Sequence, residues 1–130
     1  MTEEEKNLVE IKIKSEDIFD GTLLHVKRDT VKLPNGNEST REWIKHQGAS
    51  AVIPVLPDGR IILVKQYRYP IHKITLEIPA GKLDAPDEDP LLCATRVLSE
   101  ETGYSAENIE KLTTIATTVG FSNEYIHLYI

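Results

Sequence analysis

The sequence predicts an α+β fold, and three observations lead to this class. Strand-like runs make up most of the 130 residues. Two pairs of these runs are joined by Pro-Asn-Gly-Asn at 34–37 and by Pro-Asp-Gly at 57–59, and such turns between strand-like runs are typical of β-hairpins. One helix is expected between Asp89 and Gly103. Strands, then a helix, then strands is an order typical of α+β domains.

The expected strands differ in their predicted burial. The apolar runs AVIPV at 51–55 and IILV at 61–64 predict strands that are buried on both faces and therefore lie at the centre of a domain. The segments with strand-like character are residues 8–14, 22–33, 38–46, 49–56, 60–69, 74–81, 108–119 and 124–130.

The expected helix has clear start and stop signals. Asp89 can cap its N-terminus, and Pro90 suits the first helical position. Gly103 can end the helix in the left-handed conformation. At about 100° per residue, the stripe expected to face the core contains Leu91, Ala94 and Leu98, and the adjoining flank contains Cys93, Val97, Glu100 and Glu101.

Size and composition limit the classes of function. A chain of 130 residues supports one domain with a modest core, or one domain with a small appendage. A change in composition near residue 47 predicts an N-terminal β appendage, 1–46, and a main domain, 47–130.

The formal net charge of −6 argues against a general nucleic-acid-binding protein. Because the sequence has neither a secretory signal nor an apolar run of membrane-spanning length, we expect a cytoplasmic protein with no membrane partner.

The end of the helix carries the most informative chemistry. Glu100 and Glu101 are adjacent, and Arg96 precedes Glu100 by one turn. Paired carboxylates near an arginine can hold a hard divalent cation against a phosphate. The alternative is a solvated helix end in which Glu100 pairs with Arg96 at the i,i+4 spacing.

The segment GKLDAPDEDPLLCATRVLSEETGY, residues 81–104, resembles the Nudix box, whose pattern is G-x5-E-x7-R-E-U-x-E-E-x-G-U with U aliphatic or aromatic. The matching residues are Gly81, Glu88, Arg96, Leu98, Glu100, Glu101, Gly103 and Tyr104. The flanking sequences LVKQYRYP, LEIPAGKLD and GFSNEYIHLYI resemble the ADP-ribose pyrophosphatase branch. The resemblance covers about residues 20–130. It implies a Nudix-type α/β/α sandwich, with a mixed sheet and the box helix, preceded by an antiparallel β appendage.

The resemblance also implies a metal site. Glu100, Glu101 and the backbone carbonyl of Ala80 would hold Mg²⁺, with Mn²⁺ as an alternative. Arg96 would orient a carboxylate of the box, so that it joins Glu100 and Glu101 in the catalytic group. Gly81 would let the loop backbone come close to the site, and Gly103 would shape the loop after the helix.

Four further residues are implied in substrate binding. Arg68 would contact a phosphate, and Glu77 would lie near the metal and substrate. Arg41 and Trp43 would contact adenine in the partner subunit's site. The non-functional alternatives are a surface arginine at a strand end for Arg68, a polar strand position for Glu77, and an interface or core residue for Trp43. The loop residues near the terminal ribose would be Gly120, Phe121, Ser122 and Glu124.

The sequence departs from the family pattern at four places. Val97 stands where the box has a glutamate that is a main metal ligand, and its alternative role is simple packing. The loop from Gly81 to Glu88 is one residue longer than the pattern. Val119 replaces a proline that is usual in the branch. The chain stops at Ile130, where the family continues, so we expect that the C-terminal part of the fold is missing.

The resemblance implies Mg²⁺-dependent hydrolysis of ADP-ribose, or of another nucleoside diphosphate sugar, giving AMP and ribose 5-phosphate, and we expect Val97 to impair this reaction. A homodimer formed through the N-terminal strands is implied by the resemblance. Two alternatives stay open at this point. One is a weak or inactive module that binds ADP-ribose-like ligands, and the other is a truncated chain that folds only through strand exchange between subunits.

Overall fold

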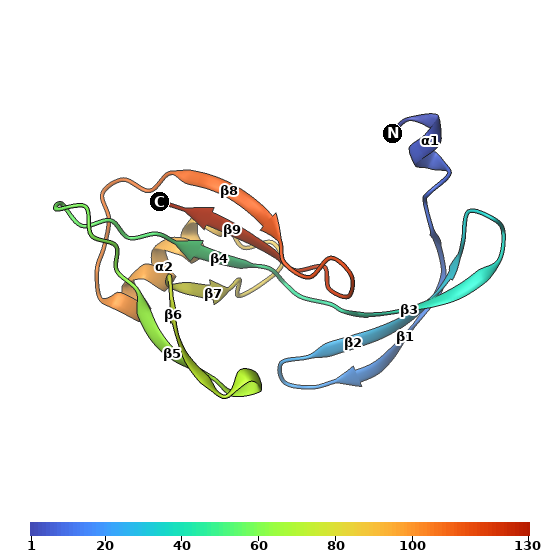
Figure 1. The fold of residues 1–130 in the computed structure, drawn as a ribbon, viewed down its shortest axis with the longest axis horizontal. Helices are drawn as coiled ribbons and strands as arrows, with labels where there is room; N and C mark the ends of the chain where they lie inside the picture. The colour runs from blue at the N-terminus through green and yellow to red at the C-terminus, as the bar shows by residue number, and fades with distance from the viewer. The chain divides into compact units, whose positions relative to one another are not determined.

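The computed structural model describes residues 1–130, which form two compact units (Figure 1). The first unit contains Met1–His46 together with Thr118–Asn123. The second contains Gln47–Thr117 together with Glu124–Ile130. No helix of the structure is both long enough and apolar enough to cross a membrane. The division into domains at 1–46 and 47–130 stays a prediction.

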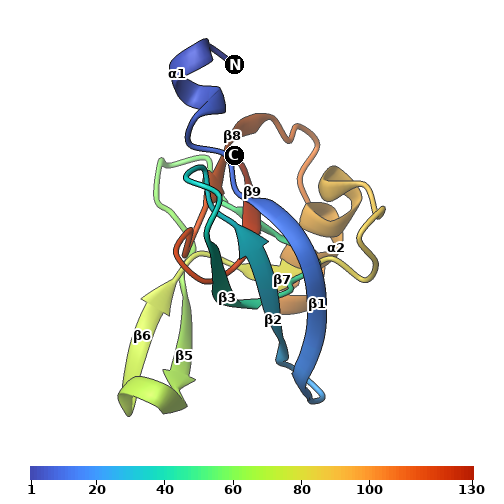
Figure 2. The same cartoon turned by 90° about the vertical axis from the view of Figure 1, so that its right-hand side faces the viewer.

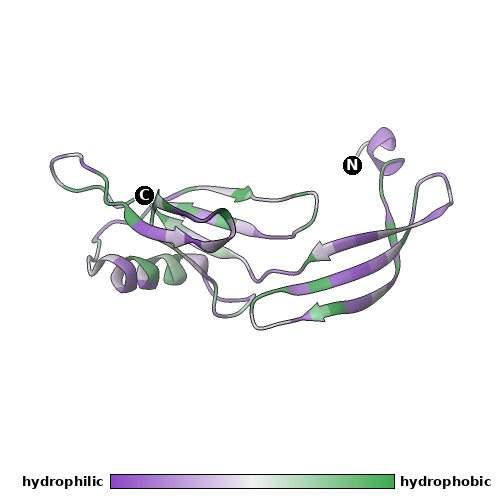
Figure 3. Cartoon of the chain, turned by 60° about the horizontal axis from the view of Figure 1, so that its bottom comes forward, coloured by the Kyte–Doolittle hydropathy of each residue, from purple (hydrophilic) through white to green (hydrophobic).

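The first unit is an antiparallel sheet of three strands in the order β1-β2-β3 (Figure 2). A short helix, α1 (Glu3–Lys6), precedes β1 (Ile11–Asp20), β2 (His25–Lys32) and β3 (Glu38–Ile44). The predicted Asn-Gly turn joins β2 to β3, with Gly36 at φ 90°. All ten residues of β1 are exposed, and the three strands are mainly hydrophilic in Figure 3.

The second unit is built on a mixed sheet with the strand order β7-β4-β9-β8. β4 (Ala49–Val52) pairs in parallel with β9 (Tyr125–Tyr129) and antiparallel with β7 (Ala80–Lys82). β8 (Lys111–Ala116) pairs antiparallel with β9. The helix α2 (Pro90–Thr102) packs on β4 and β7. The predicted α+β class, with a mixed sheet and a box helix, is confirmed.

A separate two-stranded hairpin completes the second unit. β5 (Val64–Arg68) pairs antiparallel with β6 (Lys73–Glu77), and the 3₁₀ turn η1 (Tyr69–Ile71) joins them. The strand predicted at 74–81 is therefore wrong as a single element. It divides at Pro79, which has no N–H to donate to a continuing ladder, and its two parts enter different sheets.

The prediction of two strands buried on both faces is correct only for the start of the first run, AVIPV. β4 is buried throughout but ends at Val52, and Val55 is exposed. The run IILV is not buried: Ile61 and Leu63 are exposed, and β5 begins only at Val64. The Pro-Asp-Gly turn at 57–59 forms as expected. The segments on either side of it are joined by only one isolated β-bridge, between Val55 and Ile61. The apolar character of this run therefore did not lead to burial in the sheet.

The core lies between α2 and the sheet. One cluster contains Val52, Ala94, Leu98 and Tyr129, and a second contains Leu83, Cys93 and Val97. The expected core position of Leu91 is wrong, because its side chain is exposed. The buried stripe of α2 consists of Cys93, Ala94, Val97 and Leu98, and Leu91 lies about 90° from the centre of that stripe at 100° per residue.

Candidate functional site

The helix α2 places its last turn next to the loop that follows β6. The Asp89 side chain caps its N-terminus by accepting the Leu91 N–H at 3.0 Å. Gly103 ends it with φ 75° and donates its N–H to the Ser99 carbonyl at 2.9 Å. These caps fix where the helix stops, so they also fix the positions of Glu100 and Glu101 in its last turn.

Glu101 is joined directly to the Pro-Ala-Gly turn. Its Oε2 accepts the backbone N–H of Ala80 at 3.3 Å. The backbone of Ala80 and the carboxylate of Glu101, both predicted as metal ligands, therefore come together. Glu100 is exposed beside it.

Arg96 forms ion pairs with carboxylates of the loop that precedes α2 and not with Glu100 in the last turn of the helix. Its Nη2 donates to Glu88 Oε1 at 3.0 Å and Oε2 at 3.3 Å, and its Nη1 donates to Asp84 at 3.3 Å. Glu88 Oε1 also accepts the Asp84 N–H at 2.8 Å. The alternative ion pair between Arg96 and Glu100 is not formed in the structure. The partner Asp84 was not anticipated, because only the folded loop brings it beside Arg96.

Val97 is a packed core residue, with 3% of its surface exposed. It contacts Leu83 and Cys93, and a Cβ built on Gly81 would lie 2.7 Å from Val97 Cγ2. Gly81 is thus required by the close approach of the loop to α2. No three Asp, Glu, His or Cys side chains form a group that could hold a metal ion.

The side chains at this site still fit a magnesium ion that arrives with a phosphate. Mg²⁺ is usually bound by one or two carboxylates together with substrate phosphates and water. Glu100 and Glu101 supply two carboxylates, and the Ala80 backbone lies beside Glu101. The protein alone would supply only part of the ligands of such an ion, and substrate phosphate and water would have to supply the rest.

Arg68 and Glu77 form a bidentate ion pair across the hairpin. Arg68 Nε donates to Glu77 Oε2 at 2.7 Å, and Arg68 Nη2 donates to Oε1 at 2.5 Å. The Thr75 hydroxyl also donates to Oε2. These hydrogen bonds, first from Arg68 and then from Thr75, lower the pKa of Glu77 to about 2. The Glu77 carboxylate is therefore ionised at every pH well above that value.

Electrostatics connects this pair to the box helix. Hydrogen bonding to Glu77 raises the pKa of Arg68, and the negative charges of Glu77 and Glu101 add to that effect against the cost of partial burial. A hollow of about 360 Å³ beside α2 is lined by Lys82, Asp84, Arg96, Glu100 and Glu101 among others, and this volume is within the usual range for ligand sites.

The other predicted contact residues belong to the first unit or to its border. Arg41 pairs with Glu10 at 2.6 Å and 2.9 Å, which raises the pKa of Arg41. Trp43 is half-buried on β3. Phe121 accepts the Ile44 N–H at 2.7 Å through its carbonyl, and Glu124 accepts the Thr117 hydroxyl at 2.7 Å. Roles for these residues in binding adenine or ribose stay predictions.

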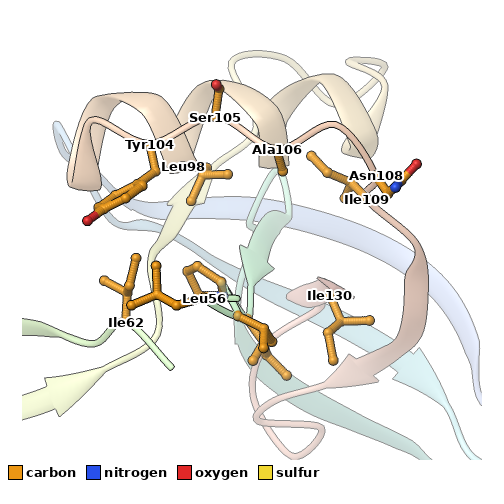
Figure 4. A pocket seen from close by; sticks show the side chains of 12 residues that line it. Leu56, Ile62, Leu98, Tyr104, Ser105, Ala106, Asn108, Ile109 and Ile130 are labelled. Atoms are coloured by element: carbon orange, nitrogen blue, oxygen red, sulfur yellow. The ribbon is translucent and has the colours of Figure 1, made fainter. Parts of the chain in front are cut away.

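A second cavity of the same unit has a different character. It is about 180 Å³ and is lined mainly by apolar side chains from α2, from the loop after it and from the segments that follow β4 and β9, including Leu56, Ile62, Leu98, Tyr104 and Ile109 (Figure 4). It contains no charged side chain. A diphosphate would find no cationic partner there, so the charged groups near Glu101 form the better candidate site.

Comparison with known families agrees with this geometry. Residues 45–130 match the NUDIX domain, and residues 10–44 match the nucleoside diphosphate sugar hydrolase N-terminal domain. The chain belongs to the Nudix family. The segment that carries Glu100 and Glu101 is accordingly its Nudix box, with valine at position 97.

Individual relatives show which Nudix proteins this chain is similar to. The chain is 49% identical over 118 residues to the methanol dehydrogenase activator of Bacillus methanolicus, covering 91% of this chain and 63% of that protein. It is 45% identical over 125 residues to the ADP-ribose pyrophosphatase of Bacillus subtilis (strain 168), covering 96% of this chain and 67% of that protein. The chain thus spans about two thirds of the length of these curated relatives.

A solved structure supports the fold. The crystal structure of an ADP compounds hydrolase matches with a TM-score of 0.81 at 20% identity, covering 94% of this chain and 66% of that one. At this level of identity the match concerns the fold alone. It confirms the Nudix-like architecture predicted from the box and its flanks.

Proposed function

We propose that this Nudix protein hydrolyses the pyrophosphate bond of ADP-ribose, or of a related nucleoside diphosphate sugar, with Mg²⁺ or Mn²⁺ as cofactor. Water adds to one phosphorus, the bond between that phosphorus and the bridging oxygen breaks, and the proton released from the water goes to solvent. For ADP-ribose the products are AMP and ribose 5-phosphate. The single observation that carries the proposal is the hydrogen bond between Glu101 and the Ala80 backbone, in the same unit as the Arg68–Glu77 ion pair.

Each residue of the site has a defined task in this proposal. The Arg68 guanidinium binds a phosphate and stabilises negative charge that develops during the reaction. Glu100, Glu101 and the Ala80 carbonyl would hold the metal ion, which when bound neutralises phosphate charge and supports the attacking water. Arg96 keeps the loop between β7 and α2 in place through Glu88 and Asp84. Glu77 anchors Arg68.

A paired turnover assay of this chain and Val97→Glu with ADP-ribose and Mg²⁺ tests the proposed impairment. We expect the Glu variant to be about 10- to 100-fold faster, because a further carboxylate next to the metal site restores a ligand. Val97→Gln is the matched control, since glutamine has the shape of glutamate without its charge. This variant should turn over no faster than the unaltered chain. Equal rates for this chain and Val97→Glu, with both folded by circular dichroism, would show that Val97 does not limit hydrolysis.

A second candidate function is a module that binds ADP-ribose-like ligands with little or no hydrolysis. The buried position of Val97 favours it, because the side chain serves the core and supplies no metal ligand. Calorimetric binding of ADP-ribose without release of AMP would support this candidate. Measurable turnover by the unaltered chain would support hydrolysis, and a panel of nucleoside diphosphate sugars would then define the substrate.

We also propose a cytoplasmic homodimer that forms through the N-terminal strands, with Arg41 and Trp43 contacting adenine at the partner subunit's site. The ten exposed residues of β1, among them Ile11, Ile13 and Phe19, support a role for this sheet in association. Light scattering should give twice the mass of the chain. A monomeric mass at micromolar concentration, together with cooperative unfolding, would contradict the dimer.

A further inference from the structure

Thr75 lies in the same strand as Glu77 and on the same face. The two residues are two positions apart on β6, so their side chains point to one side of the hairpin. The Thr75 hydroxyl contacts Glu77 Oε2, and the Gln66 carbonyl is 3.3 Å away. A hydroxyl has one hydrogen to donate, and the closer acceptor is the carboxylate.

The Glu77 carboxylate is fully engaged by its neighbours. Both of its oxygens accept hydrogen bonds from Arg68, and one also accepts the Thr75 hydroxyl. Arg68 uses Nε and Nη2 for this pair, while its Nη1 makes no hydrogen bond in the structure. The Arg68 side chain is 49% exposed. One edge of the guanidinium is therefore held by Glu77, and the other is open to a ligand.

We infer that Thr75 is a positioning residue: its hydroxyl orients Glu77, which in turn holds Arg68 with an open edge toward a nucleoside diphosphate. This inference rests on the proposed function. Thr75 itself touches no ligand, and its effect passes through Glu77 and Arg68. The backbone pairing of β5 with β6 does not depend on the hydroxyl, so its removal leaves the hairpin intact.

Calorimetric titration into the full chain, with Mg²⁺ and with an ADP-ribose analogue whose bridging oxygen is replaced by CH₂ so that it cannot be hydrolysed, tests the inference. We expect Thr75→Val to weaken binding about tenfold, because a hydrogen bond to a charged group is lost. Thr75→Ser, which keeps the hydroxyl, should bind within about twofold of the unaltered chain. Thr113→Val, which changes an exposed threonine on β8, is the matched control and should change nothing.

The titration of Glu77, followed by NMR of the carboxyl carbon, gives a readout that does not depend on activity. The carboxyl should titrate near pH 2 in the unaltered chain and in Thr75→Ser, and at a higher pH in Thr75→Val. An unchanged titration in Thr75→Val, unchanged ADP-ribose affinity in that variant, or equal losses for serine and valine would each overturn the positioning role.

The outcomes separate this inference from the proposed function. If the unaltered chain binds ADP-ribose and Thr75→Val binds it equally well, the inference fails and the proposed function stands. If the unaltered chain does not bind ADP-ribose at all, both are overturned.

Discussion

Replacing Glu101 by glutamine is expected to lower kcat/KM for ADP-ribose by about a hundredfold or more. In the proposed site Glu101 would hold the metal ion, and a bound metal contributes several kcal/mol of charge stabilisation in reactions of this kind, where each 1.36 kcal/mol is about tenfold in rate. Glutamine keeps an oxygen that can still accept the Ala80 N–H, so the local fold should persist. Steady-state release of AMP is the measurement.

The matched control for this change is Glu107→Gln. Glu107 is exposed in the loop after α2, and its replacement alters the net charge by the same amount. It should keep the activity of the unaltered chain. Glu101→Gln with activity near that of Glu107→Gln would remove Glu101 from the catalytic site.

Replacing Leu98 by alanine is expected to lower the free energy of unfolding by about 2–5 kcal/mol. Leu98 is 2% exposed and packs with Val52, Ala94 and Tyr129 between α2 and the sheet. Such a loss is a large part of the total of about 5–15 kcal/mol that is typical of a small domain. Urea unfolding followed by circular dichroism gives the difference.

Leu92→Ala is the control for the core substitution. Leu92 is on the same helix and is 61% exposed, so its truncation should change stability by no more than about 0.5 kcal/mol. A Leu98→Ala variant as stable as Leu92→Ala would show that α2 does not pack on the sheet as described.

Local signals predicted the parts of the fold that depend on neighbouring residues. The Asp89 cap, the Gly103 stop and the Asn-Gly hairpin turn all form where expected. Each involves residues within a few positions of one another, where side chain and backbone chemistry decide the outcome. The box pattern named Glu101 and Ala80 together, and in the structure the Glu101 carboxylate accepts the Ala80 N–H; their role as metal ligands stays a prediction.

Other features depend on packing between distant segments, and these were not predictable. The run at 61–64 looks like a buried strand in sequence, but its burial depends on which elements cover it. The exposure of Leu91 likewise depends on how α2 meets the sheet, whereas the division at Pro79 had a local signal, since proline cannot donate to a ladder. A threonine two positions before Glu77 was a weak signal for the hydrogen bond to its carboxylate, since alternate strand residues share a face.

The central claim is that Glu101 and Arg68 bind a cation and a diphosphate at one site, and a crystal structure with Mn²⁺ and ADP-ribose tests it most directly. We expect anomalous density from Mn²⁺ at the Glu101 carboxylate, with a phosphate oxygen on Arg68. A bound ion elsewhere, with the Glu101 side chain turned away from it and the diphosphate not touching Arg68, would contradict a shared site.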